Sequence, residues 1–431
     1  MAHIAQESRQ RNRMPSMSGG ILQRHSSQIT ESSSAGVFRS FWQAGFEGAD
    51  HTNGRGRALD MNEVTQHRAQ ARQDYLRLAE FNIQVVRESV GWRLVEKDGA
   101  FDFSPIAGRA FAARELGLQV NWILCHYGWP TDVDVFSDEF VDRFVRYCEA
   151  VARYLKPRSD APRFYTPMNE ISFLAWAICE SRLIYPYTEA LKARGYECKQ
   201  QLVRAAIAGC EAIWSVDPQA RIVQTDPLIH IVAPRKRPEL AGAAEQMRLA
   251  QFQAWDMLCG DLEPQLGGKP KYLDILGVNY YHGNQWEHLT GERLHWHLKD
   301  PRRIPFHRML EEVYGRYARP LFIAETSHIG VGRGEWITEI AQEVGIALEH
   351  GVPLEGICLY PTVDRPSWED FSHWHNSGLW DFVPGTDGTL NRVLNEPYAH
   401  DLRLAQRAIA ESLAKISRSS DLRQPIIRGT Q

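Results

Sequence analysis

Two glutamates at the ends of hydrophobic segments are the residues in this sequence most able to do chemistry. Glu170 ends the segment 166–170 (TPMNE), and Glu325 lies in the segment 321–326 (LFIAET). A carboxylate at the end of a buried strand costs desolvation energy unless it is paired or used. Two such carboxylates are the minimum equipment for cleaving a glycosidic bond. We therefore treat Glu170 and Glu325 as candidate catalytic residues.

The segments that must position these glutamates alternate between strand and helix patterns, which predicts a parallel sheet. Strands are predicted at residues 37–46, 82–89, 118–125, 163–168, 221–226, 272–281, 320–324 and 354–360. Helices are predicted at residues 66–81, 111–116, 136–155, 200–216, 335–350 and 402–416. Eight strands with intervening helices predict an α/β fold, a single (β/α)8 TIM barrel.

The ends of the chain and one long connection are expected to differ from the barrel. Residues 1–36 are rich in Ser, Gln and Arg, which predicts a disordered leader before a barrel at 37–416. Residues 417–431 are expected to form a disordered tail. The connection from Glu170 to about Tyr196 is too long for an ordinary loop, so we expect this insertion after the fourth strand to fold over the active site.

Composition excludes several classes of partner. The net charge of -4 gives no reason to expect binding to nucleic acid, and no apolar run approaches the roughly 20 residues that span a membrane. The seven cysteines lack CxxC pairing and His-rich neighbours, which predicts reduced thiols and a cytoplasmic location. His373 and His375 have no clear third ligand, so we expect no metal and no cofactor.

Polar residues at the ends of the predicted strands are the candidates for a binding site, because barrel active sites lie there. Besides the two glutamates they are Glu47, Arg87, His126, Asn169, Asn279, Tyr281 and Trp368. His126, with Trp129 and Pro130 close behind it, is expected to contact a sugar. Trp129 and Trp368 are expected to bind substrate by stacking on a sugar face.

The two carboxyl groups support a double displacement if they face one cleft. Glu325 would attack the anomeric carbon, while Glu170 would protonate the leaving oxygen and then deprotonate water. Arg87 and Tyr281 are expected to keep Glu325 ionised and oriented.

The order and spacing of these motifs resemble those of the family 1 glycoside hydrolases, the β-glucosidase and β-galactosidase group. The resemblance covers about residues 38–400 and is carried by 46–48 (FEG), Arg87 with Ser89 and Trp92, 126–130 (HYGWP), 168–170 (MNE), 276–281 (LGVNYY), 323–325 (IAE) and 377–381 (SGLWD). It implies that Glu170 is the acid/base and Glu325 the nucleophile, oriented by Tyr281 and Arg87. It further implies that Asn169 binds the sugar 2-hydroxyl and His126 a hydroxyl further round the ring.

The departures from that pattern concern the wall that recognises the sugar. Gly45 stands where the family usually has a glutamine, and 360–361 (YP) and 367–369 (SWE) replace the usual Trp-Ser and Glu-Trp pairs. Thr326 and Ser327 replace an expected Asn-Gly. Asp364 and Glu369 either bind substrate hydroxyls or solvate a loop. The catalytic residues therefore look retained and the wall rebuilt, so the sequence does not assign glucose.

The sequence thus predicts a retaining β-glycosidase that hydrolyses O-glycosidic bonds of a small β-linked glycoside or oligosaccharide. Two alternatives stay open. A transglycosylase would use the same covalent intermediate, and a carbohydrate-binding protein without turnover would keep only the fold. The sugar, the aglycone and the oligomeric state are not specified by the sequence.

Overall fold

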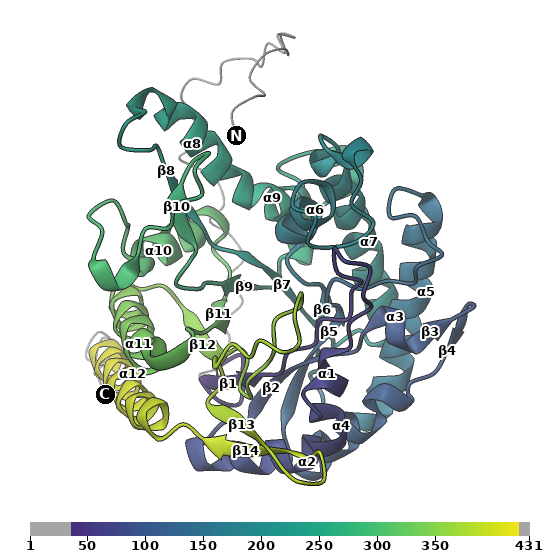
Figure 1. Cartoon of the computed structure of the whole chain (residues 1–431), viewed down its shortest axis with the longest axis horizontal. Helices are drawn as coiled ribbons and strands as arrows, with labels where there is room; N and C mark the ends of the chain where they lie inside the picture. Colours follow the sequence, from purple (N-terminus) through teal and green to yellow (C-terminus); the bar gives the residue numbers. More distant parts are fainter. Residues whose placement is uncertain (1–35, 422–431) are drawn as a thin grey trace, which may run out of the picture. The chain divides into compact units, whose positions relative to one another are not determined.

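A closed barrel of eight parallel strands is the centre of the computed structural model, which describes residues 36–421 (Figure 1). Neighbouring strands follow the order β1-β12-β11-β9-β7-β6-β5-β2. Their bounds are β1 (Trp42–Gly45), β2 (Val85–Ser89), β5 (Gln119–Cys125), β6 (Phe164–Met168), β7 (Arg221–Pro227), β9 (Ile275–Asn279), β11 (Leu321–Thr326) and β12 (Leu354–Leu359). Each predicted strand corresponds to one of these, so the predicted (β/α)8 barrel is confirmed.

Helices surround the barrel and cover its outer face (Figure 1). The principal ones are α2 (His67–Leu78), α4 (Ser104–Glu115), α5 (Asp138–Leu155), α7 (Gly195–Val216), α10 (Phe306–Tyr317), α11 (Arg333–Glu349) and α12 (Glu396–Asp421). In α5 the Ser137 side chain accepts a hydrogen bond from the backbone N–H of Phe140 (3.3 Å), and the buried residues of the helix include Phe144, Tyr147 and Val151. The capped start and the apolar stripe explain why this segment was predicted correctly.

Shorter elements were not predicted. Two-stranded sheets are formed by β8 (His230–Val232) with β10 (Gln285–Glu287), by β13 (Trp380–Pro384) with β14 (Leu390–Leu394), and by β3 (Glu96–Lys97) with β4 (Ala100–Phe101). The unpredicted helices are α1 (Met61–Val64), α3 (Trp92–Val95), α6 (Ile171–Cys179), α8 (Ala241–Leu249), α9 (Gln253–Cys259) and α10. The strands β3, β4, β8 and β10 have only two or three residues, which are too few positions for a periodic pattern to be detected.

Several predicted boundaries were wrong. The helix predicted at residues 111–116 begins at Ser104, and the helix predicted from residue 200 begins at Gly195. The first strand begins at Trp42 rather than at residue 37, because Phe38 instead packs on Phe164 and Phe322, with ring centroids 5.2 Å and 5.0 Å apart. The last helix continues past residue 416 to Asp421. Residues 1–35 and 422–431 lie outside the described residues, so the predicted disorder of the leader and of the remaining tail stays a prediction.

The barrel interior has an apolar layer toward the amino ends of the strands. It consists of Phe38, Val85, Phe164, Val223, Ile275, Phe322 and Ala324. A Cβ added at Gly277 would lie 2.7 Å from Thr225 Cγ2 and 2.8 Å from Ala324 Cβ, so this position admits only glycine. Two residues after Val85 on the same strand face comes Arg87, so the polar layer lies nearer the carboxyl ends, where barrel active sites lie.

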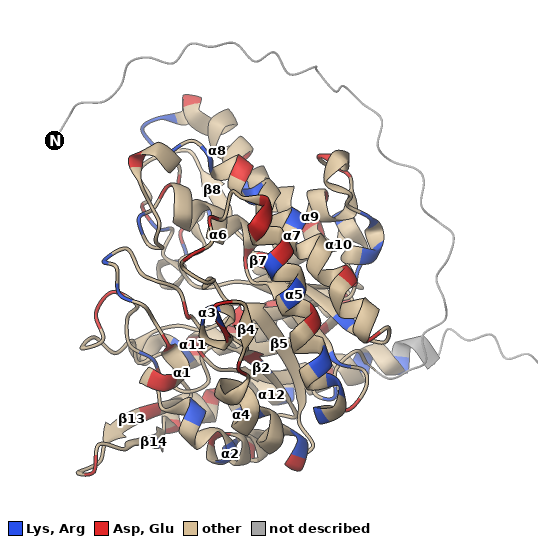
Figure 2. Cartoon of the chain, turned by 90° about the vertical axis from the view of Figure 1, so that its right-hand side faces the viewer, with Lys and Arg blue, Asp and Glu red and all other residues tan. Residues whose placement is uncertain are grey.

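Acidic and basic residues are interspersed along the outer helices (Figure 2). Several form ion pairs between helices, such as Arg72 of α2 with Glu115 of α4 at 2.9 Å. All seven cysteines are free. Within residues 36–421, no helix is both long enough and apolar enough to cross a membrane.

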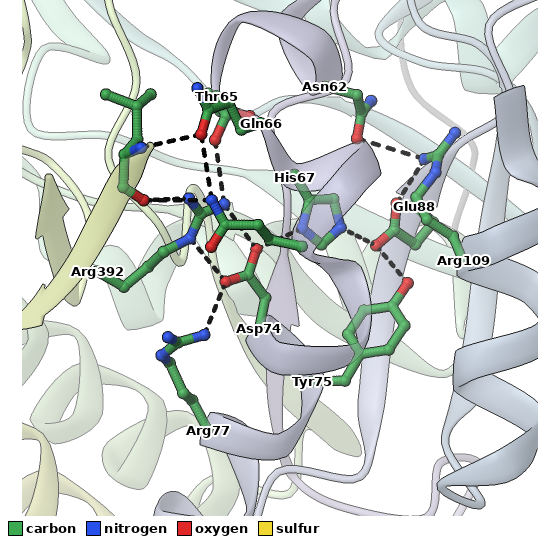
Figure 3. Close-up of polar contacts among 12 residues, drawn as sticks. Asn62, Thr65, Gln66, His67, Asp74, Tyr75, Arg77, Glu88, Arg109 and Arg392 are labelled. Carbon is green, nitrogen blue, oxygen red and sulfur yellow. Dashed lines mark hydrogen bonds and ion pairs between the residues drawn. The ribbon is translucent and has the colours of Figure 1, made fainter. Parts of the chain in front are cut away.

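A buried network of charged side chains joins α2, β2, α4 and β14 (Figure 3). His67 Nδ1 lies 2.8 Å from Asp74 Oδ2, and His67 Nε2 lies 2.8 Å from Glu88 Oε1. Arg392 reaches both oxygens of Asp74 at 2.8 Å and 2.9 Å, and Arg109 reaches Glu88 Oε2 at 2.6 Å. Both imidazole nitrogens face carboxylates, and both can donate only when the ring is charged.

The charged groups of this network stabilise the charged forms of their neighbours. Burial lowers the pKa of His67, but Glu88 and Asp74 outweigh burial and raise that pKa above its ordinary value of 6.5. Burial raises the pKa of Glu88, but His67 and Arg109 outweigh it and lower that pKa to about 2.

Replacing His67 with Ala is therefore expected to destabilise the fold by about 3–5 kcal/mol, because it leaves two buried carboxylates without their shared cation. A His whose pKa is raised stabilises fully below 6.5 and loses this effect as pH rises through its folded pKa. A Glu whose pKa is lowered stabilises fully above 4.5 and loses the effect as pH falls toward 2. Urea unfolding should thus show the largest difference between native protein and variant between about pH 4.5 and 6.5.

His350→Ala is the matched control, because His350 pairs with Glu311 at the surface and its side chain is 50% exposed. Surface pairs contribute about 1 kcal/mol or less. Equal stability losses for the two variants at pH 5.5 would contradict the role assigned to His67.

Candidate active site

The carboxyl ends of five barrel strands, β2, β6, β7, β9 and β11, bring most of the predicted site residues together. Arg87 Nη1 donates to Glu325 Oε1 (2.9 Å), and its Nη2 donates to Asn169 Oδ1 (3.0 Å). The Tyr281 hydroxyl donates to Glu325 Oε2 at 2.7 Å. Thr225 also donates to Asn169 Oδ1, at 2.8 Å. Both oxygens of Glu325 therefore receive donors, one of them charged, which stabilises its negative charge.

A β-bulge turns Glu325 toward the other site residues. Phe322 and Ala324 belong to the interior cluster, so regular alternation would send the next side chain outward. Ile323 pairs with Val278 and Glu325 pairs with Asn279, which leaves Ala324 as an extra residue in β11. An extra residue of this kind re-aims the side chains that follow it. The bulge is the local reason why Glu325 meets Arg87.

Glu170 follows β6 as the residue that caps the start of α6, and it adopts a left-handed backbone with φ 51°. One oxygen accepts a hydrogen bond from Asn279 Nδ2 (2.9 Å), and the other accepts one from the Tyr127 hydroxyl. Burial and the nearby negative charge of Glu325 raise the pKa of Glu170 to about 8. This carboxyl group therefore holds its proton at neutral pH.

Tyr127 is a site residue that the sequence reasoning missed. Its hydroxyl accepts a hydrogen bond from Asn169 Nδ2 (3.1 Å) and donates one to Glu170. It is buried and has φ 79°, which is unusual for a residue with a bulky side chain and is typical of functional sites. It lies inside the 126–130 segment, but no pattern of residue types indicated that its ring would turn toward Glu170.

His126 lies at the edge of this cluster. Its Nε2 is 3.5 Å from Asn169 Nδ2, and its Nδ1 is 3.5 Å from the Tyr360 hydroxyl. Burial, together with Arg87, lowers the pKa of His126 well below its ordinary value. The imidazole is therefore uncharged and offers one donor and one acceptor, which suits a hydroxyl group.

In the wall beyond His126, the side chain of Tyr360 fills the space that a side chain at position 45 would need. A Cβ at Gly45 would overlap the ring of Tyr360, so the large side chain after β12 occupies the room that a glutamine at position 45 would need. The Tyr360 hydroxyl lies 3.5 Å from Glu47 Oε1, and Arg365 Nε lies 3.0 Å from Glu47 Oε2. The rebuilt wall predicted from the sequence thus centres on Tyr360, Glu47 and Arg365, and the last of these was not foreseen.

Comparison with known proteins identifies the fold of the chain but not its family. No family model matches the chain, and no curated protein matches it. Solved structures do match. A family 1 β-glucosidase from Thermotoga maritima aligns with a TM-score of 0.69 and 14% identity, over 86% of this chain and 98% of that one. The chain has the fold of a family 1 β-glucosidase.

Two further structures give the same result. The AHE enzyme from Alicyclobacillus herbarius aligns with a TM-score of 0.67 and 15% identity, over 86% of this chain and 98% of its own. A β-glucosidase from Thermotoga maritima in complex with glucoimidazole aligns with a TM-score of 0.65 and 13% identity, over 80% and 88% of the two chains. The resemblance inferred from the sequence is thereby confirmed for the fold, and at these identities for the fold alone.

Two predicted residues, Trp129 and Trp368, lie at the edge of the candidate active site. Trp129 is buried, with Nε1 donating to the carbonyl of Val133 (3.2 Å), and it lines a neighbouring cavity. Trp368 packs edge-on against Tyr127, with ring centroids 5.7 Å apart. Among the described residues, neither indole hydrogen-bonds to Glu170 or Glu325; Trp129 donates to Val133, and the buried Trp368 Nε1 has no hydrogen-bond partner.

Asp364 and Glu369, for which the sequence left two roles open, both make contacts that fix loops. Asp364 Oδ1 accepts a hydrogen bond from the backbone N–H of Ser377 at 2.9 Å, and Glu369 pairs with Arg55 at 3.1 Å. Among residues 36–421, no group of three or more His, Cys, Asp or Glu side chains is arranged to hold a metal ion.

Tyr127→Phe is expected to move the alkaline limb of the pH profile of kcat/KM to higher pH. The lost hydroxyl donates to the Glu170 carboxylate, so its removal raises the pKa of Glu170 further. An acid works only while it is protonated, so activity should persist to higher pH in the variant. Tyr165→Phe is the control, because the buried Tyr165 hydroxyl has no hydrogen-bond partner among the described residues. An unmoved or lowered limb in Tyr127→Phe would contradict the contact.

Proposed function

We propose that this protein is a retaining β-glycosidase, with Glu325 as nucleophile and Glu170 as acid/base. The observation that supports the proposal is that two carboxyl groups in one buried site have different surroundings. Glu325 receives an ion pair from Arg87 and a hydrogen bond from Tyr281. Glu170, buried beside the charge of Glu325, has its pKa raised to about 8. Two carboxyl groups in such different surroundings can divide the acid and nucleophile roles.

In the first step, a Glu325 oxygen forms a bond to the anomeric carbon as the bond from that carbon to the leaving oxygen breaks. The proton of Glu170 passes to the leaving oxygen, so the aglycone departs as a neutral alcohol. Glu170 is then ionised, and the sugar is held as an ester of Glu325.

In the second step, the Glu170 carboxylate takes a proton from water while the water oxygen attacks the anomeric carbon and the ester bond breaks. The two glutamates return to their starting protonation states. Each displacement inverts the anomeric carbon, so the released sugar has the β configuration of the substrate.

Asn169 supports the same chemistry as a fixed donor. Arg87 and Thr225 both donate to its Oδ1, which leaves its Nδ2 directed to the Tyr127 hydroxyl. In this proposal a sugar 2-hydroxyl takes the place of the phenol on Asn169. A hydrogen bond to that hydroxyl strengthens as charge develops at the anomeric carbon.

The test is release of nitrophenol from 4-nitrophenyl β-glycosides of glucose, galactose, fucose, xylose, mannose and glucuronic acid. Turnover of at least one of them is expected, with the β anomer appearing first in the NMR spectrum of the products. Appearance of the α anomer first would contradict retention, and silence toward every sugar would contradict hydrolysis. An added acceptor alcohol that captures most of the product would indicate a transglycosylase instead.

A further inference from the structure

The helix that follows Glu170 begins without a cap from its own N-cap residue. Glu170 is the N-cap residue of α6, yet its side chain makes no hydrogen bond to the first turn of that helix. Its two oxygens instead accept from Asn279 and Tyr127 in the candidate active site. The first N–H groups of a helix have no partners within the helix, so this buried helix start needs an acceptor from elsewhere.

Asp226, near the end of β7, supplies that acceptor. Its Oδ1 accepts from the backbone N–H of Ser172 (3.1 Å), and its Oδ2 accepts from the hydroxyl of the same serine (2.8 Å). The backbone N–H of Phe173 also donates to this carboxyl group. The carbonyl of Thr225, the preceding residue of β7, accepts from the N–H of Glu170 (3.1 Å). Two consecutive residues of β7 therefore hold the turn from which the Glu170 side chain projects.

This arrangement separates capping from catalysis. A carboxylate that caps a helix from its own N-cap position is turned toward the backbone N–H groups of the first turn. Because Asp226 takes this role, the Glu170 carboxyl group is free to face the candidate active site. Asp226 itself is buried, with 1% of its surface exposed, and the mechanism proposed above gives it no chemical step.

Asp226 also adds charge near the proposed acid. Burial outweighs the opposing effect of the positive Lys199 and raises the pKa of Asp226 to about 7. The pKa of Glu170 is about 8, so Asp226 is ionised over the pH range in which Glu170 titrates. After burial and the charge of Glu325, the charge of Asp226 is a further cause that raises the pKa of Glu170. Two buried carboxyl groups close together disfavour simultaneous ionisation.

The groups that face these two carboxyl groups come from several elements. Lys199 of α7 is the cation beside Asp226, and its ammonium donates to the carbonyl of Ala250 (3.1 Å) and to Gln253 Oε1 (2.9 Å). Ser172 and Phe173 of α6 are its uncharged partners. Those that face Glu170 are Glu325 of β11, Tyr127 after β5 and Asn279 of β9.

We propose that Asp226 is a positioning residue for the acid/base: it caps α6 in place of Glu170, and its negative charge favours the protonated form of the Glu170 carboxyl group. The inference rests on the proposed function, in which Glu170 is the acid/base, and concerns how the ionisation of that group is set. Asp226 acts through Glu170 and needs no contact with the substrate.

Asp226→Asn separates the charge from the cap. The asparagine Oδ1 accepts from the N–H of Ser172 and its Nδ2 donates to the serine hydroxyl, so the helix start keeps its partners. The substrate is a methyl β-glycoside of the sugar identified by the aryl glycoside panel, because its methanol leaving group needs a proton. The alkaline limb of kcat/KM should move to lower pH. Below that limb, at about pH 6, kcat/KM should stay within about threefold of native.

Asp226→Ala removes the cap as well as the charge. At about pH 6, kcat on the methyl glycoside should fall by about tenfold while KM changes less, because a misplaced acid impairs proton transfer more than sugar binding. A glycosyl fluoride needs no proton, so its kcat should fall by about threefold at most. Equal losses on the two substrates would indicate general damage to the site and would overturn the positioning role.

Asp102→Asn is the matched control. Asp102 makes the same pair of contacts at the start of α4, where it accepts from the N–H of Ser104 (2.9 Å) and from the hydroxyl of that serine (2.9 Å), but it is exposed. This variant should keep the native rate and the native pH profile. A shift of the alkaline limb as large as that of Asp226→Asn would overturn a specific effect of Asp226.

The ionisation of Glu170 can also be followed without turnover. In protein labelled with ¹³C at the Glu side-chain carboxyl carbon, the NMR signal missing from Glu170→Gln belongs to Glu170. Its titration midpoint should be lower in Asp226→Asn than in native protein and unchanged in Asp102→Asn. An unchanged or higher midpoint in Asp226→Asn overturns the inference, also where Asp226→Ala does not fold. A lowered midpoint in a protein that turns over none of the sugars would support the role of Asp226 and contradict the proposed function.

Discussion

Glu325→Gln is expected to lower kcat by on the order of 10⁴-fold or more, because the amide cannot form the covalent bond to the anomeric carbon. The substitution keeps the size of the side chain and an oxygen that accepts from Arg87 or Tyr281, so the site geometry should survive. The measurement is kcat on the best aryl glycoside, with thermal unfolding of both proteins to establish that the variant is folded.

Azide distinguishes a missing nucleophile from a damaged site. In Glu325→Gly the anion can enter the space of the lost carboxylate and attack the anomeric carbon from the same face. Only one displacement then occurs, so the glycosyl azide should have the α configuration. A Glu325→Gln variant that retains more than a tenth of native kcat would contradict the assignment.

Glu170→Gln should lower kcat/KM by about 10²- to 10⁴-fold for substrates whose leaving group needs a proton. The loss should be much smaller for a glycosyl fluoride, because its leaving group departs as an anion without protonation. The glycosyl ester on Glu325 should then accumulate, because no base remains to activate water. Added azide, which needs no base, should restore turnover and give the β-glycosyl azide.

The pH profile gives an independent check on Glu170. The pKa of Glu170 is raised to about 8, so native kcat/KM for a sugar leaving group should fall as pH rises through this value and the acid loses its proton. This alkaline limb should be absent in Glu170→Gln. An identical limb in native protein and variant would assign it to another group and remove Glu170 from the acid role.

The regular part of the fold could be predicted from the sequence because it follows short-range patterns. Buried parallel strands appear as continuous hydrophobic segments, and helix α5 as an apolar stripe that follows a capping serine. The two glutamates could be predicted because each follows such a segment. In contrast, α10 and the β13–β14 hairpin were missed, although α10 buries Phe306, Met309, Leu310 and Val313 on one side. That stripe was available in the sequence and was not used.

The details of the site depend on contacts that local patterns do not contain. Strict alternation after Phe322 and Ala324 places Glu325 on the outer face of the barrel, and only the bulge in pairing with β9 reverses this. Tyr127 contacts Glu170, 43 residues further along the chain, through a backbone conformation that its residue type disfavours. Neither feature follows from composition or periodicity, because both depend on how distant segments pack.

The overlap between position 45 and the ring of Tyr360 constrains how this wall can change over time. A side chain introduced at Gly45 alone would meet the ring, and a smaller residue at position 360 alone would leave a hole beside the buried Glu47. Each single change is therefore expected to destabilise the wall, and the effects of the two substitutions are expected to be non-additive because the two positions are in contact. A lineage with one form of the wall is separated from the other by a fitness valley, and sugar preference in such a lineage is expected to switch in a paired step rather than drift.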